Sequence, residues 1–125
     1  MSVVKIKGCK CLSHNPRTMV CPYDVKSPQN RFVSMEEVIV NNGPQGFSLA
    51  RIMWDDAADG KVEKVLAMRW NGYLESDGHL NKGHPVTRGY PTWFIVPVEL
   101  EEALLSHKDY LVNIPQRLDM VVVNK

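Results

Sequence analysis

The residues with the widest chemical repertoire gather in two segments, 68–73 and 88–97, and in the loop between them. They are two arginines, two tryptophans, an asparagine and a histidine: Arg69, Trp70, Asn71, His84, Arg88 and Trp93. Aromatic rings and guanidinium groups stack on flat ligands, bases or peptide side chains, and such residues dominate binding hot spots. We therefore predict that these residues form a binding site for an unknown small molecule or protein. The alternative is structural, because buried tryptophans are common core anchors in small domains.

Three cysteines and a histidine near the N-terminus form a second group. Cys9, Cys11, His14 and Cys21 place four soft ligands within 13 residues, and structural zinc takes four such ligands. Their spacing lacks the paired Cys-x-x-Cys pattern typical of zinc sites. Small buried thiols beside a surface histidine are the competing interpretation. A zinc-stabilised module stays open as an alternative, while no cofactor is expected.

Acid/base catalysis is the alternative to a binding function. His79 or His84 would serve as the acid or base in a cleft under the loop of residues 75–90. The sequence contains no Walker pattern, strand-linked Gly-x-Gly-x-x-Gly or local nucleophile signature. Asp55, Asp56 and Asp59 are close enough to hold a hard cation, but a solvated turn explains them better.

Composition favours one soluble domain spanning residues 1–125. The 125 residues are 44% hydrophobic, which suffices for one core. The 15 basic and 14 acidic side chains nearly cancel, which argues against a nucleic-acid partner. Lysines interrupt the N-terminal apolar residues, so we expect no signal peptide, and no apolar stretch is long enough for a membrane partner. An odd cysteine count favours the cytoplasm.

The chemistry-bearing segments must be held by a mostly antiparallel sheet. Apolar alternation and turn residues predict strands over residues 3–12, 38–40, 47–54, 62–70, 92–96, 110–114 and 118–123. Glutamates follow Pro97, and leucines at helical spacing predict the main helix over residues 98–107. A capping-box spacing at 34–37 predicts one further helical turn.

The element order predicts an α+β fold. We expect a meander of antiparallel strands in a strongly curved sheet, which would be barrel-like at the extreme, around one main helix. The β-branched segment Val121, Val122 and Val123 would lie at a sheet edge. Because edge strands offer unpaired backbone groups, a homodimer through this strand is expected.

A family resemblance rests on the same two segments. Residues 66–72 read LAMRWNG, a Gly/Pro-rich loop follows, and residues 89–97 read GYPTWFIVP before an acidic helix. This pattern resembles a set of small uncharacterised bacterial proteins, some of them encoded in mobile integron gene cassettes. The resemblance covers about residues 47–105. It implies a bacterial accessory protein and carries no established activity or catalytic residue with it.

Overall fold

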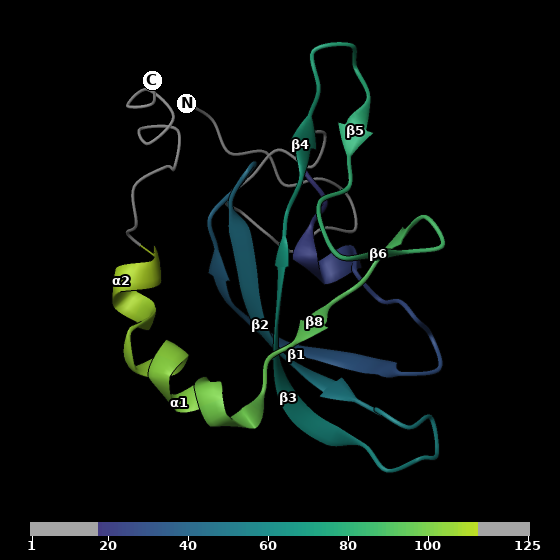
Figure 1. Ribbon diagram of the computed structural model, residues 1–125, viewed down its shortest axis with the longest axis vertical. Helices are drawn as coiled ribbons and strands as arrows, with labels where there is room; N and C mark the ends of the chain where they lie inside the picture. Colours follow the sequence, from purple (N-terminus) through teal and green to yellow (C-terminus); the bar gives the residue numbers. More distant parts are fainter. Residues whose placement is uncertain (1–17, 113–125) are drawn as a thin grey trace.

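The computed structural model describes residues 18–112 of the chain (Figure 1). In chain order its elements are the 3-10 helix η1 (Pro22–Asp24), the strands β1 (Phe32–Asn41), β2 (Phe47–Trp54), β3 (Glu63–Trp70), β4 (Tyr73–Leu74), β5 (Leu80–Asn81), β6 (Val86–Thr87), β7 (Tyr90–Pro91) and β8 (Phe94–Ile95), and the helices α1 (Val98–Ser106) and α2 (Lys108–Val112).

The central element is a four-stranded sheet in the order β1-β2-β3-β8, with every neighbouring pair antiparallel. Two small two-stranded sheets, β4-β5 and β6-β7, extend from it. These strands and α1 confirm the α+β class with a mainly antiparallel sheet and one main helix. Over residues 18–112 the sheet stays open, with β1 and β8 as its edges, so the barrel-like closure is not found there.

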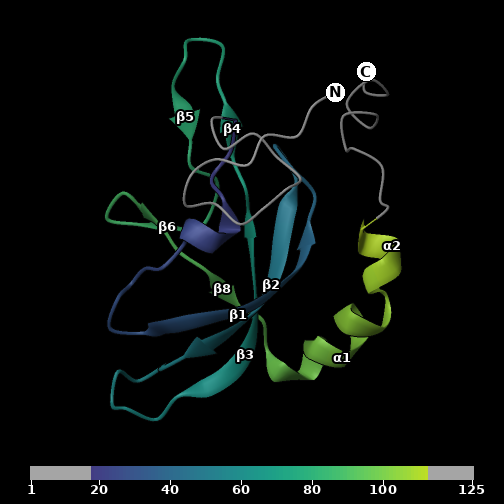
Figure 2. The same ribbon diagram turned by 180° about the vertical axis from the view of Figure 1, so that it is seen from behind.

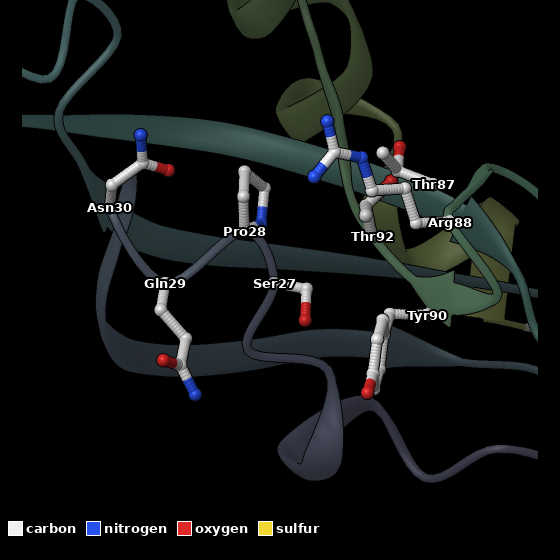
Figure 3. Close-up of a pocket in the computed structure, with 8 residues that line it drawn as sticks. All are labelled: Ser27, Pro28, Gln29, Asn30, Thr87, Arg88, Tyr90 and Thr92. Carbon is white, nitrogen blue, oxygen red and sulfur yellow. The ribbon is translucent and has the colours of Figure 1, made fainter.

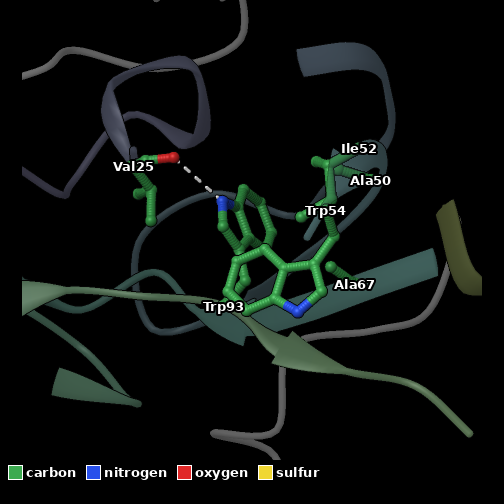
Figure 4. Close-up of a cluster of buried hydrophobic side chains, with 6 residues drawn as sticks. All are labelled: Val25, Ala50, Ile52, Trp54, Ala67 and Trp93. Carbon is green, nitrogen blue, oxygen red and sulfur yellow. Dashed lines mark hydrogen bonds between the residues drawn. The ribbon is translucent and has the colours of Figure 1, made fainter. Parts of the chain in front are cut away.

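One face of the sheet packs against the segment around η1. Side chains of β2 and β3 alternate between the two faces, as strand geometry requires. On this face Ala50, Ile52, Trp54, Ala67, Val25 and Trp93 form a buried cluster (Figure 4). The indole Nε1 of Trp93 donates a 2.9 Å hydrogen bond to the carbonyl oxygen of Val25, which fastens η1 to the sheet.

The two helices cover part of the opposite face. Figures 1 and 2 show α1 and α2 along one side of the sheet and η1 on the other. Val40, Leu49, Leu66 and Val96 are buried there, and Leu104, Leu105 and Leu111 of the helices pack on them. The side-chain amide Nδ2 of Asn42 donates a 3.0 Å hydrogen bond to the carbonyl oxygen of Leu111, which holds α2 against the end of β1.

Two predicted elements are wrong. Residues 34–37 belong to β1 and form no helical turn, since this segment pairs with β2 across bulges. Ser34 Oγ instead donates a 3.1 Å hydrogen bond to Glu36 Oε2. The predicted strand at 110–114 is also wrong in its described part, because residues 110–112 lie in α2.

Other expectations fall on residues that the structure does not describe. The predicted strands at 3–12 and 118–123 lie outside residues 18–112, and so does the segment on which the homodimer prediction rests. Within the described part of the chain, neither helix has the length and apolar character to cross a bilayer.

Candidate functional site

Arg69, a predicted site residue, is buried and hydrogen-bonds to three backbone carbonyl groups, an arrangement called here the Arg69 brace. Its side chain is only 2% exposed. Nη1 donates hydrogen bonds to the carbonyl oxygens of Thr92 (2.7 Å) and Pro85 (3.2 Å), and Nη2 donates to that of Lys82. Burial lowers the pKa of Arg69 to about 10, so the group remains a cation at neutral pH. Among residues 18–112 no carboxylate forms a salt bridge with it, and its Nε is buried without a partner.

Asn71 and Trp93 are also buried. Asn71 is fully enclosed; its Oδ1 accepts a 2.6 Å hydrogen bond from Ser48 Oγ, and its Nδ2 donates to the carbonyl oxygen of Gly43 at 2.9 Å. Trp93 lies in the cluster of Figure 4, bonded to Val25. Asn71, Trp93 and Arg69 therefore have a structural role, which was the alternative to a binding site.

Trp70 and His84 form an exposed cross-strand pair. The Trp70 amide donates to the His84 carbonyl at 2.8 Å, and the His84 amide donates back at 3.3 Å. In such a reciprocal antiparallel pair the Cα atoms lie about 5.5 Å apart and the side chains stand on the same face. Trp70 is 48% exposed, and His84 is exposed as well. The backbone therefore places an indole beside an imidazole at the surface.

An apolar hollow of about 380 Å³ opens next to this pair. It is lined by Phe47, Met68, Arg69, Trp70, His84, Pro85 and Phe94. Phe47 lies opposite Trp70, and Phe94 lies opposite Met68, so the hollow is a continuation of the sheet face that α1 and α2 cover elsewhere. Phe94 is 54% exposed. Two half-exposed aromatic rings thus border one concavity.

A second hollow, of about 440 Å³, shares the same pair and is called here the polar hollow because amide and phenol side chains line part of it. Its lining residues are Gln45, Trp70, Gly72, Tyr73, Asn81, Gly83 and His84. Gln45 and Asn81 contribute amides and Tyr73 a phenol, whereas the apolar hollow offers mostly rings and hydrocarbon. Trp70 and His84 therefore border an apolar hollow and a polar hollow at once.

Arg88 belongs to a different site. It lies at the tip of the β6-β7 hairpin and lines a third hollow of about 460 Å³, called here the hairpin hollow (Figure 3). Ser27, Pro28, Gln29 and Asn30 form one wall, and Thr87, Arg88, Tyr90 and Thr92 form the other. A parallel β-bridge between Ser27 and Thr92 joins the two walls.

The six predicted site residues therefore separate into three groups. Arg69, Asn71 and Trp93 are buried scaffold, Trp70 and His84 are paired at the surface, and Arg88 lines a separate hollow. Arg69 also lines the apolar hollow, so the brace supports the site from beneath.

Sequence reasoning missed the apolar partners of Trp70. Phe47, Met68 and Phe94 come from three strands, and only the pairing of those strands brings them together. The two-residue period of a strand already places Met68 on the same side as Trp70. Phe47 and Phe94 could be added only with the register known.

The metal predictions have little geometric support among the described residues. Between residues 18 and 112, no three His, Cys, Asp or Glu side chains are grouped to hold a metal ion. Cys21 is buried there, while Cys9, Cys11 and His14 lie outside that range, so zinc stays a prediction.

Asp55 organises the β2-β3 loop from within. Its carboxylate accepts hydrogen bonds from the amides of Gly60 (2.7 Å) and Asp59 (3.0 Å). The hydrogen bond from Gly60 lowers the pKa of Asp55 below its ordinary value, the bonds from Asp59 and Ala58 act in the same direction, and desolvation partly opposes them. The side chain is thus committed to the turn, as the turn interpretation of this loop expects.

Comparisons of this chain with protein-family models, curated proteins and solved structures found no match.

Proposed function

We propose that this protein is a non-enzymatic binding module that takes a flat apolar group into the apolar hollow beside Trp70 and His84. The group belongs either to a small molecule or to a side chain of a partner protein. Concave sites of a few hundred Å³ with mostly apolar walls and few polar groups are typical ligand sites. The apolar hollow has this size and lining.

The observation that carries the proposal is the reciprocal hydrogen-bonded pair of Trp70 and His84. A ligand ring that stacks on a surface indole gains most when the indole is already held in place, because less conformational entropy is lost on binding. The two backbone bonds, the opposed Phe47 and the Arg69 brace all restrain this end of β3. Gln45 and Asn81 in the polar hollow would then accept or donate hydrogen bonds to a polar end of the same ligand.

The enzyme alternative would use His79 or His84 as an acid or base, and of these two only His84 lines any of the three hollows. A catalytic histidine is normally oriented by a second polar group. In residues 18–112, no carboxylate accepts a hydrogen bond from the His84 ring or forms an ion pair with it, so the geometry gives no specific support to this alternative. Within residues 18–112, no observation supports a zinc-stabilised or a nucleic-acid-binding module either.

The direct test is an NMR titration of the labelled protein with 2-naphthol, a neutral flat probe. We expect chemical-shift changes centred on Trp70, His84 and Phe94. Trp70→Ala should weaken binding about tenfold or more, because it removes the stacking surface.

The matched control is Val33→Ala, which trims a 51% exposed apolar side chain of β1 that lines none of the three hollows. If Trp70→Ala and Val33→Ala bind 2-naphthol equally well, the apolar hollow is not the binding site.

An origin as a bacterial accessory protein encoded on mobile DNA is proposed from the sequence resemblance alone. A cytoplasmic location is proposed from the composition of the chain. A homodimer is proposed from the pattern of the C-terminal strand.

A further inference from the structure

We propose that the hairpin hollow is a second binding site, separate from the apolar hollow, for a small cyclic molecule that carries a phosphate or carboxylate group. Arg88 is the residue that would bind the oxyanion. The hollow has a volume of about 460 Å³, which suits a ligand of one or two rings.

The lining of the hairpin hollow carries a positive charge. Arg88 is the only charged residue among the eight described residues that line the hairpin hollow. Its side chain is exposed, and it forms no hydrogen bond or ion pair with another residue of the 18–112 range. A guanidinium presents a planar fork of donors that matches two oxygens of a carboxylate or phosphate. Within residues 18–112, the donors of Arg88 are therefore not engaged and can meet such a group.

A second cation lies at the same hairpin tip. Lys82 Nζ donates a 2.7 Å hydrogen bond to the carbonyl oxygen of Gly89, the residue next to Arg88. The ammonium group adds positive potential on one side of the hollow, and among the described residues no carboxylate lines the hollow to oppose it. An anionic ligand is accordingly favoured over a cationic one.

The backbone at Arg88 adopts a conformation that is unusual for an arginine. Thr87 pairs with Tyr90, so Arg88 and Gly89 are the two central residues of a tight hairpin turn. Both have positive φ, 53° for Arg88 and 84° for Gly89. A turn of this kind strongly prefers Asn, Asp or Gly at its first central position, because a longer side chain is strained in the left-handed region. Arginine at this place is explained by what its side chain binds rather than by the turn.

The other residues that line the hairpin hollow indicate which further groups the ligand carries. The ring of Tyr90 is 65% exposed and offers a stacking surface at one wall. Across from it, Ser27, Gln29 and Asn30 contribute a hydroxyl and two amides from the other wall (Figure 3). A ring that bears an oxyanion and further polar substituents would use both walls.

The experiment is an NMR titration with phenyl phosphate, benzoate and phenol, together with melting curves. Phenyl phosphate or benzoate should shift resonances of Thr87, Arg88 and Tyr90, and phenol should bind at least about tenfold more weakly, because it lacks the anion. The anion that binds with the higher affinity identifies phosphate or carboxylate as the preferred group.

The decisive variant is Arg88→Asn, since asparagine suits the first position of this turn. We expect it to abolish the shifts caused by phenyl phosphate and benzoate while Tm stays constant or rises. Lys61→Asn removes an exposed cation from the β2-β3 loop and serves as the charge-matched control, with binding retained.

Three results would overturn the proposal: no binding of either anion, anion binding that survives Arg88→Asn, or a fall in Tm for that variant. The binding of 2-naphthol beside Trp70 should be unchanged in Arg88→Asn. The two sites can therefore fail or succeed independently.

Discussion

Arg69 Nη1 donates a 2.7 Å hydrogen bond to the carbonyl oxygen of Thr92, a residue 23 positions later in the chain. The same side chain also bonds to the carbonyls of Lys82 and Pro85. The buried guanidinium group thus hydrogen-bonds to the segment between β3 and β8 at three points and holds it against the sheet. The exposed pair of Trp70 and His84 depends on this brace, because His84 is flanked by segments that Arg69 holds.

Arg69→Met should destabilise the protein severely. The change removes the Arg69 donors from three carbonyl oxygens, although the Pro85 carbonyl keeps a hydrogen bond from the Thr92 amide. An unsatisfied buried acceptor costs about 1–3 kcal/mol, partly offset by removing a buried charge. We expect a loss of about 2–4 kcal/mol in the free energy of unfolding, measured by urea denaturation. Arg51→Met is the control: Arg51 forms a partly exposed salt bridge of 3.0 Å with Glu101, worth about 0–1 kcal/mol. Equal losses for the two variants would contradict the bracing role.

Gly72→Ala and Gly83→Ala should each prevent the close approach of the two segments that meet at Trp70 and His84. A Cβ on Gly72 would collide with the carbonyl oxygen of Asn81, and one on Gly83 with that of Trp70. We expect losses above about 3 kcal/mol in the free energy of unfolding.

Gly78→Ala separates this collision from backbone strain. Gly78 also has a positive φ of 90°, but a Cβ there would meet no atom within 4 Å. The Gly78→Ala variant should lose only about 1–2 kcal/mol in the free energy of unfolding, which is the cost of a side chain in the left-handed region. A loss at Gly72 no larger than at Gly78 would contradict the close packing.

Asn71→Asp should destabilise the protein in a pH-dependent way. The substitution replaces the Nδ2 donor by an oxygen that faces the Gly43 carbonyl, so a buried carboxylate would be repelled. Because burial raises the pKa of such a group, the variant should lose about 2–4 kcal/mol at pH 7 and regain part of it as pH falls. Thermal melts at pH 7 and pH 5 measure the difference. Asn30→Asp, at an exposed position, is the control, and the same pH trend in both variants would count against the Asn71 network.

Asp55 should make the fold sensitive to acid. Its pKa is lowered in the folded protein, chiefly by the hydrogen bond from the Gly60 amide, relative to an ordinary value of 3.8. The stabilisation is therefore complete above about pH 4 and is lost as pH falls through the lower folded-state value. Melting curves between pH 6 and pH 2 should show a steeper fall in Tm for the native protein than for Asp55→Asn.

Asp24→Asn removes an exposed carboxylate of η1 and provides the reference for that comparison. If the Asp55→Asn curve runs parallel to the Asp24→Asn curve, Asp55 makes no special contribution to acid sensitivity.

The sequence alone determined the strands β2 and β3, the helix α1 and the α+β class. The turn residues before the apolar segment 47–54, the alternation along residues 62–70 and the glutamates after Pro97 are local signals, and a single sequence contains such signals. The turn at residues 34–37 was mispredicted because pairing with β2 satisfies the backbone of β1 better than a capping box does. A local helical preference of this kind yields when a neighbouring strand provides a full set of hydrogen bonds.

The chemistry-bearing residues were identified by type, but only the tertiary structure decided what each one does. Arg69 and Arg88 look equivalent in the sequence, yet one is sealed beneath the sheet face and the other lies open at a hairpin tip. The difference arises from strand register and from the path of residues 71–93, which return the chain so that His84 meets Trp70. Those contacts join residues far apart in sequence, and their free energy depends on the packing of the whole sheet rather than on any local pattern.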